Sequence, residues 1–322
     1  MIKKDINENT IDEMYPGVID ILLVDRTTRK NIIFASENYK KHGFGPGEKD
    51  FIKKDMILRK RGSVIKPRIH KSVSEQKKRS KDMAEVFTPS WVCNKQNNLI
   101  DEEWFGYKNP FNKEIGEEWE SNNKVEFRDK NWKEYVDLER LEITCGEAPY
   151  LTSRYDVVTG NYIDPFNRIG LLDRKLRVIS ENIKDKSEWI KYTLIAFQRI
   201  YGFDFQGDNV FLSRSNLLFT FIDFYYYQFS ELPTLEEITE IATIISWNIW
   251  QMDGIKYVLP LSCHEETVIQ PRLFDDFFND ADEEPYKCRG CKSGNIYQHN
   301  GVYSKIMDWR INKKIKFIDL LR

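Results

Sequence analysis

One stretch constrains the fold of this 322-residue chain more than any other: residues 138–151, LERLEITCGEAPYL. Its first half predicts a β-strand that ends at Glu142, and Cys145 and Gly146 predict a tight turn after it. In open α/β sheets, ligands bind just beyond the carboxyl ends of the strands. Gly146 has no Cβ, so a ligand can approach the backbone closely and a positive φ is allowed. The stretch therefore predicts a ligand-binding turn, although an ordinary βα turn can also contain one glycine.

A second stretch, residues 200–218, repeats this pattern with the sequence IYGFDFQGDNVFLSRSNLL. It predicts a strand that ends in Asp204 and continues as a helix, and an acid in this place commonly holds a ribose diol. Helical patterns over 187–199, 213–227 and 233–250 alternate with the strands, as they do around a parallel sheet. We therefore expect an α/β fold with a mostly parallel, doubly wound sheet and a nucleoside-shaped pocket between the two strand ends.

Four segments resemble, in their order, the motifs of γ-type adenine-N6 DNA methyltransferases, the M subunits of restriction-modification systems. LEITCGEAPYL resembles the cofactor motif of that family, and IYGFDFQGDN resembles the strand and helix that come next. EVFTP at 85–89 resembles the opening Phe-x-Thr-Pro motif, and NIWQMD at 248–253 resembles a later strand that ends in an acid. The resemblance implies a class I methyltransferase fold that binds S-adenosylmethionine. The residues that it places on the cofactor are Phe87, Thr88, Pro89, Glu142, Cys145, Gly146, Asp204, Phe205 and Asp253.

The element that grips the target adenine in this family is missing. An Asn-Pro-Pro-Tyr-like tetrapeptide should follow NIWQMD, and none of the residues after it contains one. Asn109-Pro110-Phe111 and Asp164-Pro165-Phe166 each lack a proline and lie before their expected place. Asn109 and Asp164 are therefore the remaining catalytic candidates, and plain loops are the alternative.

Three explanations of the missing element stay open. The chain is a cofactor-binding subunit completed by another protein, a divergent methyltransferase that uses other residues, or a degenerate scaffold of a restriction or phage-defence system. We expect an S-adenosylmethionine-dependent, DNA methyltransferase-like protein that acts on adenine N6, with DNA and a restriction or specificity subunit as partners. A non-catalytic cofactor- or DNA-binding subunit that needs a partner chain is the alternative.

The first 80 residues predict a small unit of their own. Two apolar runs at 18–24 and 31–36 flank a polar turn, which predicts a β-hairpin and therefore a β-rich unit. The stretch from Lys53 to Arg79 is basic, and it is either a solvated surface or an arm that contacts DNA phosphates. The cofactor domain is expected to follow over residues 81–260.

The C-terminal appendage, residues 261–322, contains residues of the types that bind zinc in a C-x-x-C setting. Gly290 inside the C-x-x-C pair suits a metal-binding turn. Free thiols are the alternative, because the segment that leads to the pair is long and acidic. The last residues alternate apolar and polar around a charged turn, which predicts a hairpin or an edge strand. The candidate zinc ligands are Cys263, Cys288, Cys291 and either His264 or His299.

Composition bounds the remaining classes of function. Hydrophobic residues make up 41% of the chain, enough for a sizeable core, and a net charge of -2 argues against a globally basic protein that coats DNA. No run of about 18 apolar residues predicts a membrane span, and the first residues lack the apolar core of a signal peptide. Five cysteines in such a chain predict cytosolic thiols and a cytoplasmic protein.

Overall fold

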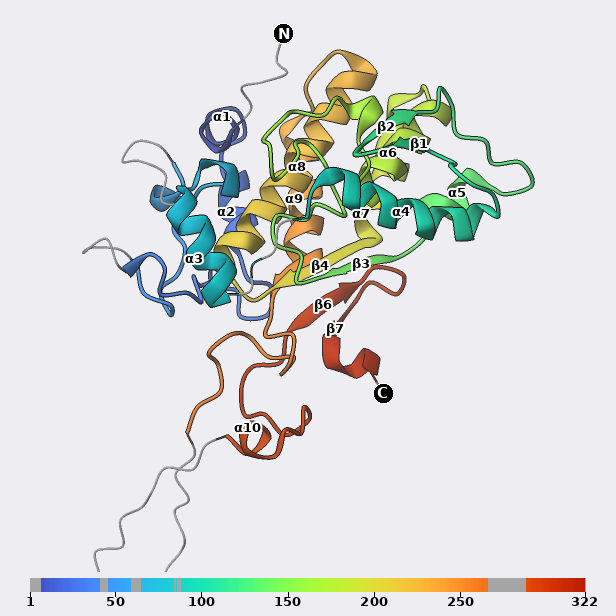
Figure 1. Ribbon diagram of the computed structural model, residues 1–322. Coiled ribbons are helices and arrows are strands. Elements are labelled where there is room, and N and C mark those ends of the chain that lie inside the picture. Colours follow the sequence, from blue (N-terminus) through green and yellow to red (C-terminus); the bar gives the residue numbers. More distant parts are fainter. Residues whose placement is uncertain are drawn as a thin grey trace, which may run out of the picture.

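The computed structural model describes residues 7–40, 46–58, 65–83, 85, 88–265 and 288–321. A three-stranded parallel sheet lies at the centre of the molecule, in the order β3 (Arg140–Ile143), β4 (Ile200–Asp204) and β5 (Ile249–Gln251) (Figure 1). Helices α6 (Leu171–Asn182) and α7 (Lys186–Gln198) connect β3 to β4, and α8 (Gly207–Phe229) and α9 (Leu235–Asn248) connect β4 to β5. The α/β character and the parallel sheet are confirmed.

The remaining elements are α1 (Glu8–Met14), α2 (Val18–Leu23), η2 (Lys54–Met56), η4 (Arg68–His70), α3 (Val73–Met83), α4 (Ser90–Phe105), β1 (Asn112–Ile115), β2 (Glu118–Ser121), α5 (Trp132–Val136), η5 (Pro165–Asn167), α10 (Arg289–Ser293), β6 (Lys305–Asp308), β7 (Lys313–Lys316) and η6 (Phe317–Leu321). The helices predicted over 187–199 and 233–250 hold within two residues at each end, whereas α8 begins six residues before the predicted start at 213. Asp185 caps α7, because its side chain accepts from the backbone N–H group of Glu188 (2.8 Å).

The expected N-terminal hairpin is wrong, because Val18–Leu23 form helix α2. Gly17, with a φ of +88°, begins the helix, and the buried side chains after it recur at helical rather than alternating spacing. They pack against α9, and the segment that follows makes only isolated bridges such as Val24 with Asn31. The described N-terminal residues are therefore helical rather than β-rich, and they share the main hydrophobic core. The buried residues of α2 are Val18, Ile19, Leu22 and Leu23.

The three central strands step across the sheet in one direction. The described residues therefore contain one winding, not the two of the expected doubly wound sheet. The edge at β5 is closed by a side chain: the Gln251 amide donates to the Ile33 carbonyl (2.8 Å) and accepts from the Ile33 N–H group (3.0 Å). β3 forms the opposite edge, and no described strand pairs with its outer side.

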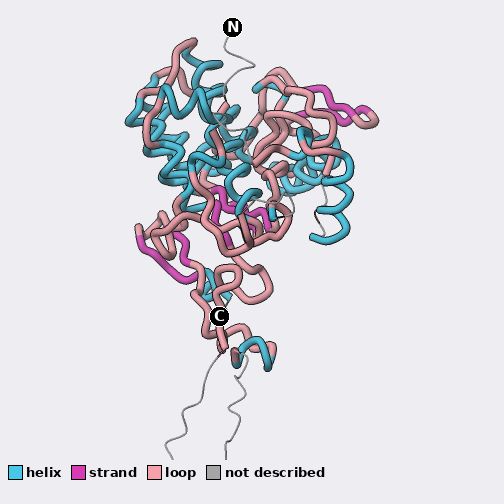
Figure 2. The backbone as a smooth tube through the Cα atoms, turned by 90° about the vertical axis from the view of Figure 1, so that its left-hand side faces the viewer, coloured by secondary structure: helices cyan, strands magenta, loops and turns pink. Residues whose placement is uncertain are grey.

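The C-terminal segment forms the expected hairpin, with β6 antiparallel to β7. The hairpin and η6 pack on one face of β4 and β5, where Ile306 and Phe317 bury Phe203 and Trp250. Figure 2 shows the helices gathered mainly above the central strands, with the C-terminal segment below them. Among the described residues, no helix combines the length and apolar character needed to cross a membrane.

Candidate functional site

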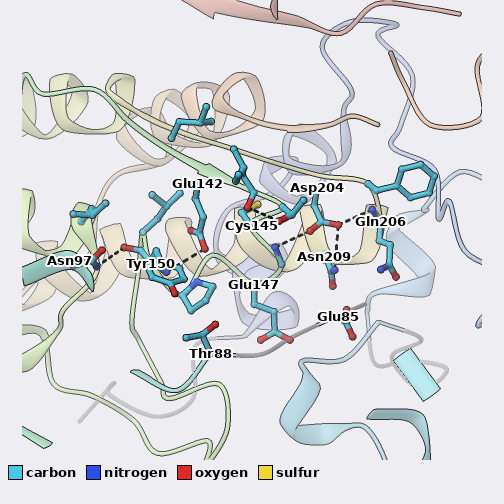
Figure 3. Close-up of a pocket in the computed structure, with 18 of the residues that line it drawn as sticks. Glu85, Thr88, Asn97, Glu142, Cys145, Glu147, Tyr150, Asp204, Gln206 and Asn209 are labelled. Atoms are coloured by element: carbon cyan, nitrogen blue, oxygen red, sulfur yellow. Dashed lines mark hydrogen bonds between the residues drawn. The ribbon is translucent and has the colours of Figure 1, made fainter. Parts of the chain in front are cut away.

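The carboxyl ends of β3 and β4 open into a cavity of about 710 Å³, a volume typical of pockets that bind small molecules. Figure 3 shows that side chains from both strand ends and from the facing loops surround this cavity. The structure thus brings together two strand ends that lie far apart in the sequence, as predicted. The predicted cofactor residues that line the cavity are Thr88, Glu142, Cys145, Gly146, Asp204 and Phe205.

The turn after β3 carries backbone N–H groups to the wall of the cavity. Gly146 has a φ of +56°, and a Cβ added there would meet no atom within 4 Å, so the space beside it is open. The Cys145 N–H group donates to the Phe203 carbonyl (2.9 Å), and the Gly146 N–H group donates to Asp204 Oδ2 (2.9 Å). These two bonds fix the turn against the end of β4.

Asp204 joins the turn after β3 to the start of α8. Besides Gly146, its carboxylate accepts from the Gln206 N–H group (2.9 Å) and from Asn209 Nδ2 (3.4 Å), both at Oδ1. Burial raises the pKa of Asp204 to about 6, although these hydrogen bonds favour the charged form. Oδ2 accepts one hydrogen bond and keeps a lone pair that a ligand hydroxyl can use.

Two acceptor atoms on residues that line the cavity have no partner. Glu142 Oε2 and Asn97 Oδ1 are both buried, and neither accepts a hydrogen bond. Both side chains are nevertheless held in place: Asn97 Nδ2 donates to the Tyr150 carbonyl (3.0 Å), and Glu142 Oε1 accepts from the Tyr150 N–H group (3.5 Å). Burial, with a smaller effect from Asp204, raises the pKa of Glu142 well above its ordinary value. Buried polar atoms are normally paired, so a bound donor could satisfy these two oxygens.

The cavity is acidic. Glu85, Glu142, Glu147 and Asp204 line it, and no lysine, arginine or histidine of the described residues does. Glu147 is satisfied within the fold, because it accepts from the Arg68 N–H group and from the Tyr155 hydroxyl (both 2.7 Å). Glu142 is thus the acid whose second oxygen remains free, and the cavity favours a ligand with positive charge.

A buried ion-pair network ties α3 to the cavity wall. Arg79 donates to both oxygens of Glu85 (2.7 Å each) and contacts Asp208 Oδ2 in the first turn of α8 (2.9 Å). Lys71 lies 3.7 Å from the same oxygen. Although burial opposes ionisation, the charges of Arg79 and Lys71 lower the pKa of Asp208 to about 2. These two cations of the basic stretch are held in internal pairs, so they do not form a free arm for DNA phosphates.

Two predicted cofactor residues, Pro89 and Asp253, do not line the cavity. Phe87 lies outside the described residues, and Pro89 precedes the first turn of α4 without lining the cavity. Asp253 accepts from the N–H groups of Ile255 (3.0 Å) and Lys256 (3.1 Å), so its carboxylate closes the turn after β5. The Asp253 carboxylate thus has a local structural role, and its expected contact with a cofactor stays a prediction.

The two catalytic candidates also lie away from the cavity. Asn109 has a φ of +57° in the turn after α4, where its N–H group donates to Glu102 (2.9 Å). Asp164 is exposed and precedes η5. Neither residue lines the cavity, so the described residues supply no Asn-Pro or Asp-Pro element there.

Some cavity residues escaped the sequence reasoning. Gln206 is the N-cap residue of α8 and Asn209 lies in its first turn, and their spacing from Asp204 was the available signal. Asn97 belongs to a stripe of buried polar residues on α4 with helical spacing, which is an unusual pattern for an inward face. The buried polar residues of this stripe are Asn94, Asn97, Asn98 and Asp101.

A second candidate site lies in the C-terminal appendage. The Sγ atoms of three cysteines and a ring nitrogen of His299 all lie within 4.8 Å of one another and could hold a metal ion. His299 Nδ1 is 3.6 Å from each sulfur. A tetrahedral zinc with bonds of about 2.3 Å to sulfur and about 2.1 Å to nitrogen separates those ligands by about 3.6 Å. The geometry therefore fits a four-coordinate centre. The three cysteines are Cys263, Cys288 and Cys291.

The surroundings of this cluster select His299 over His264. A Cβ on Gly290 would lie 2.7 Å from His299 Nδ1, so the glycine makes room for the ring, as its place in the C-x-x-C pair suggested. The Asn300 N–H group donates to Cys288 Sγ (3.3 Å). His264 is exposed, and its N–H group donates to Asn300 Oδ1 (3.2 Å), so its contact is with the loop and not with the cluster.

Comparison of the chain with protein-family models, curated proteins and solved structures finds no match.

Proposed function

We propose that this chain binds S-adenosylmethionine and forms the cofactor-binding part of a DNA methyltransferase that acts on adenine N6. One observation carries the proposal: the acidic cavity contains buried carboxylate and amide oxygens without donors, at the paired ends of two parallel strands. S-adenosylmethionine combines a sulfonium, an ammonium group and a ribose diol. Its positive charges suit a cavity lined by acids and by no basic side chain.

Each end of the cavity suits a different part of this cofactor. Glu142 Oε2 and Asn97 Oδ1 would accept from the ammonium group, because these oxygens lack donors. Asp204 would accept from the ribose hydroxyls through its remaining lone pair. Thr88 on the facing segment offers a hydroxyl for the cofactor carboxylate. In Figure 3, Asn97, Tyr150 and Glu142 lie to one side of Cys145, and Asp204, Gln206 and Asn209 lie to the other.

Methyl transfer to adenine makes a further demand on the protein. The cofactor would supply a sulfonium methyl group. When this group passes to the adenine nitrogen, the sulfur keeps the bonding electrons and becomes a neutral thioether. The adenine amine is a weak nucleophile, and two hydrogen-bond acceptors must orient it and take its proton to hold the near-attack geometry. The base must also leave the duplex. Because no Asn-Pro or Asp-Pro element of the described residues lines the cavity, we propose that a second chain supplies these acceptors.

The appendage would hold a structural zinc ion. The four residues would supply all the ligands of a tetrahedral ion and would leave no position for a substrate, which is typical of structural sites. The ion would tie Cys263 to the segment that begins at Cys288 and so brace the start of the C-terminal hairpin.

Calorimetric titration with S-adenosylmethionine tests the cofactor, with Asp204→Ala as a site variant and Glu139→Gln as a control outside the cavity. We expect binding by the wild-type chain and the control. Asp204→Ala should lose about 1.5–3 kcal/mol of binding free energy, the value of hydrogen bonds to a charged group. Unchanged affinity would remove Asp204 from the site, and no binding by the wild type would refute the proposal.

A methyl-transfer assay on mixed-sequence DNA tests the second part. The chain alone should bind cofactor yet transfer little or no methyl group. Efficient, sequence-specific adenine methylation by the isolated chain would contradict the need for a partner. In that case, separate Asn109→Ala and Asp164→Ala variants would show whether either loop reaches the cofactor.

A further inference from the structure

The outer side of β3 is the least complete part of the sheet. Strands of parallel sheets are normally covered on both faces, yet Leu141 is 46% exposed and Ile143 is 66% exposed. Ile143 pairs in register with Phe203, and Phe203 pairs with Trp250, so the three side chains lie in one row on one face. Phe203 and Trp250 are only 5% and 3% exposed under the C-terminal hairpin. The cover therefore stops one strand short of the edge.

The backbone at this edge is also available. The Arg140 N–H group donates to the Arg199 carbonyl on the β4 side (2.9 Å), and alternate residues of a strand point their backbone groups to opposite sides. Leu141 and Ile143 therefore direct theirs outward. The Ile143 carbonyl accepts from the hydroxyl of its own neighbour Thr144 (2.7 Å), a local bond that an incoming strand can replace. By contrast, the Gln251 amide closes the far edge of the sheet.

The cavity lies against this open edge. Leu141, Ile143 and Thr144 line it together with Glu142. In parallel α/β sheets, the ligand site lies where the strand order reverses, between two strands whose connections run in opposite directions. Here all connections run from β3 toward β5, so the reversal point falls at the free side of β3. On this argument, the described residues form one side of the ligand site, and their parallel strands all lie on one side of the reversal point.

We infer that a second, different polypeptide adds a parallel β-strand to the free edge of β3 and completes the site. The inference rests on the proposed function and names its partner by chemistry: an apolar strand, followed by a loop with a side-chain amide or carboxylate. Parallel addition places the carboxyl end of the new strand beside Ile143, at the mouth of the cavity. The loop after it then brings the missing acceptors to the target amine. A second copy of this chain pairing through β3 about a two-fold axis would run antiparallel and could not do so.

A photo-crosslinking experiment in the organism that makes the protein tests this pairing. The photoreactive residue p-benzoylphenylalanine replaces Ile143 in one full-length chain, Glu139 in a second and Ile255 in a third. Ile255 is the control, because it is 84% exposed and lies beyond the end of β5. We expect one heterologous protein to crosslink from positions 143 and 139 and not from 255. The adduct from 143 should map later in the partner sequence than the adduct from 139, which is the order that parallel strands require.

Reconstitution with the identified protein gives the second readout. The Leu141 and Ile143 N–H groups should exchange with solvent at least about tenfold more slowly in the purified complex than in the free chain, because both become hydrogen-bonded. Leu141→Lys and Leu141→Pro should each weaken the complex at least about tenfold, since lysine and proline both oppose edge pairing. Ile255→Lys should not. A thermal melt confirms that each variant is folded, and the wild-type crosslinking and exchange stand if a variant is not.

Several outcomes would overturn the inference: crosslinks from 143 to a second copy, no crosslink from 143, a reversed order of adducts, or unprotected Leu141 and Ile143 in the complex. Titration of the same wild-type chain with S-adenosylmethionine separates this failure from that of the proposed function. Cofactor binding without strand addition refutes the partner alone. Strand addition without cofactor binding refutes the proposed cofactor and leaves the pairing.

Discussion

Glu142→Gln gives the sharpest test of the cavity, because it removes one negative charge and hardly changes the size of the side chain. Glu142 Oε2 is buried without a partner, and burial raises the pKa of this carboxyl well above its ordinary value. An ionised Glu142 is therefore unfavourable in the free chain and favourable beside a cation. The substitution should have opposite effects on ligand binding and on stability.

The expected loss of affinity follows from the hydrogen bond that Glu142 would make. A hydrogen bond to a charged group contributes about 1.5–3 kcal/mol. At about 1.4 kcal/mol for each factor of ten, S-adenosylmethionine should bind roughly 10- to 150-fold more weakly to the variant. Glu139→Gln is the matched control, because Glu139 lies just before the same strand and its exposed carboxylate contacts Arg310 instead.

The pH dependence of binding has a definite sign. A cationic ligand favours ionised Glu142, so the free chain must give up a proton when the ligand binds at a pH below the raised pKa. Affinity should therefore rise with pH, by up to about tenfold per unit, until Glu142 is already ionised in the free chain. Calorimetry in two buffers of different ionisation enthalpy measures the proton released. The dependence should flatten in Glu142→Gln, and Asp204 would account for any slope that remains.

Stability should change in the other direction. A group whose folded-state pKa is raised adds stability below its unfolded pKa, and that stability is lost as pH rises through the folded pKa. Glu142→Gln removes this loss, so the free variant should melt at a higher temperature than the wild type at neutral pH. A variant that binds S-adenosylmethionine as tightly as the wild type, or that melts lower at neutral pH, would refute the reasoning.

Three further predictions concern other parts of the molecule. Burial raises the pKa of Asp204 to about 6, about two units above its ordinary value. At about 1.36 kcal/mol per unit, the wild type should lose about 3 kcal/mol of unfolding free energy between about pH 4 and pH 6. Denaturant titrations should show a smaller loss for Asp204→Asn, and an equal pH dependence of unfolding free energy in the two proteins would contradict the prediction. Elemental analysis after purification without chelators should find close to one zinc per chain in the wild type and much less in Cys291→Ser. No zinc in the wild type would refute the zinc site and show that its cysteines are ordinary free thiols. Arg79→Met should lower the unfolding free energy by about 3–5 kcal/mol, because it leaves buried Glu85 and Asp208 without their shared cation. The exposed control Lys77→Met should change the unfolding free energy by less than about 0.5 kcal/mol. Equal effects of the two substitutions would contradict the buried network.

The sequence predicted those parts of the fold whose patterns are local and long. The alternation of helices and strands from residue 187 to residue 251 and the C-terminal hairpin follow from periodicity within each segment. Helix α2 was misjudged because the short, mostly apolar run at 18–24 fits a strand as well as a helix, and only its packing against α9 decides between them. That no described strand pairs with the outer side of β3 could not be predicted either, since strand order is a property of the assembled sheet.

The candidate sites divide in the same way. Glu142, Gly146 and Asp204 were found because each sits at a strand end or in the turn beside it. Asn97 was missed because a polar stripe on α4 faces inward, where Arg174 from α6 satisfies its other members through contacts that span many residues of sequence. Which oxygen remains unpaired depends on all of these contacts at once. The candidate metal ligands, by contrast, were predictable because their residue types alone restrict the chemistry, and the structure places His299 rather than His264 beside the three cysteines.

The cysteine–histidine cluster has a consequence for how this scaffold can change in length. The Sγ atoms of Cys263 and Cys288 lie within 4.8 Å of each other, so these two positions are close in space although they lie far apart in the sequence. The entropy of bringing two such positions together grows only with the logarithm of the number of residues between them, and a doubling adds about 0.6 kcal/mol. The closure cost of a peptide tag inserted between these two cysteines should therefore be small.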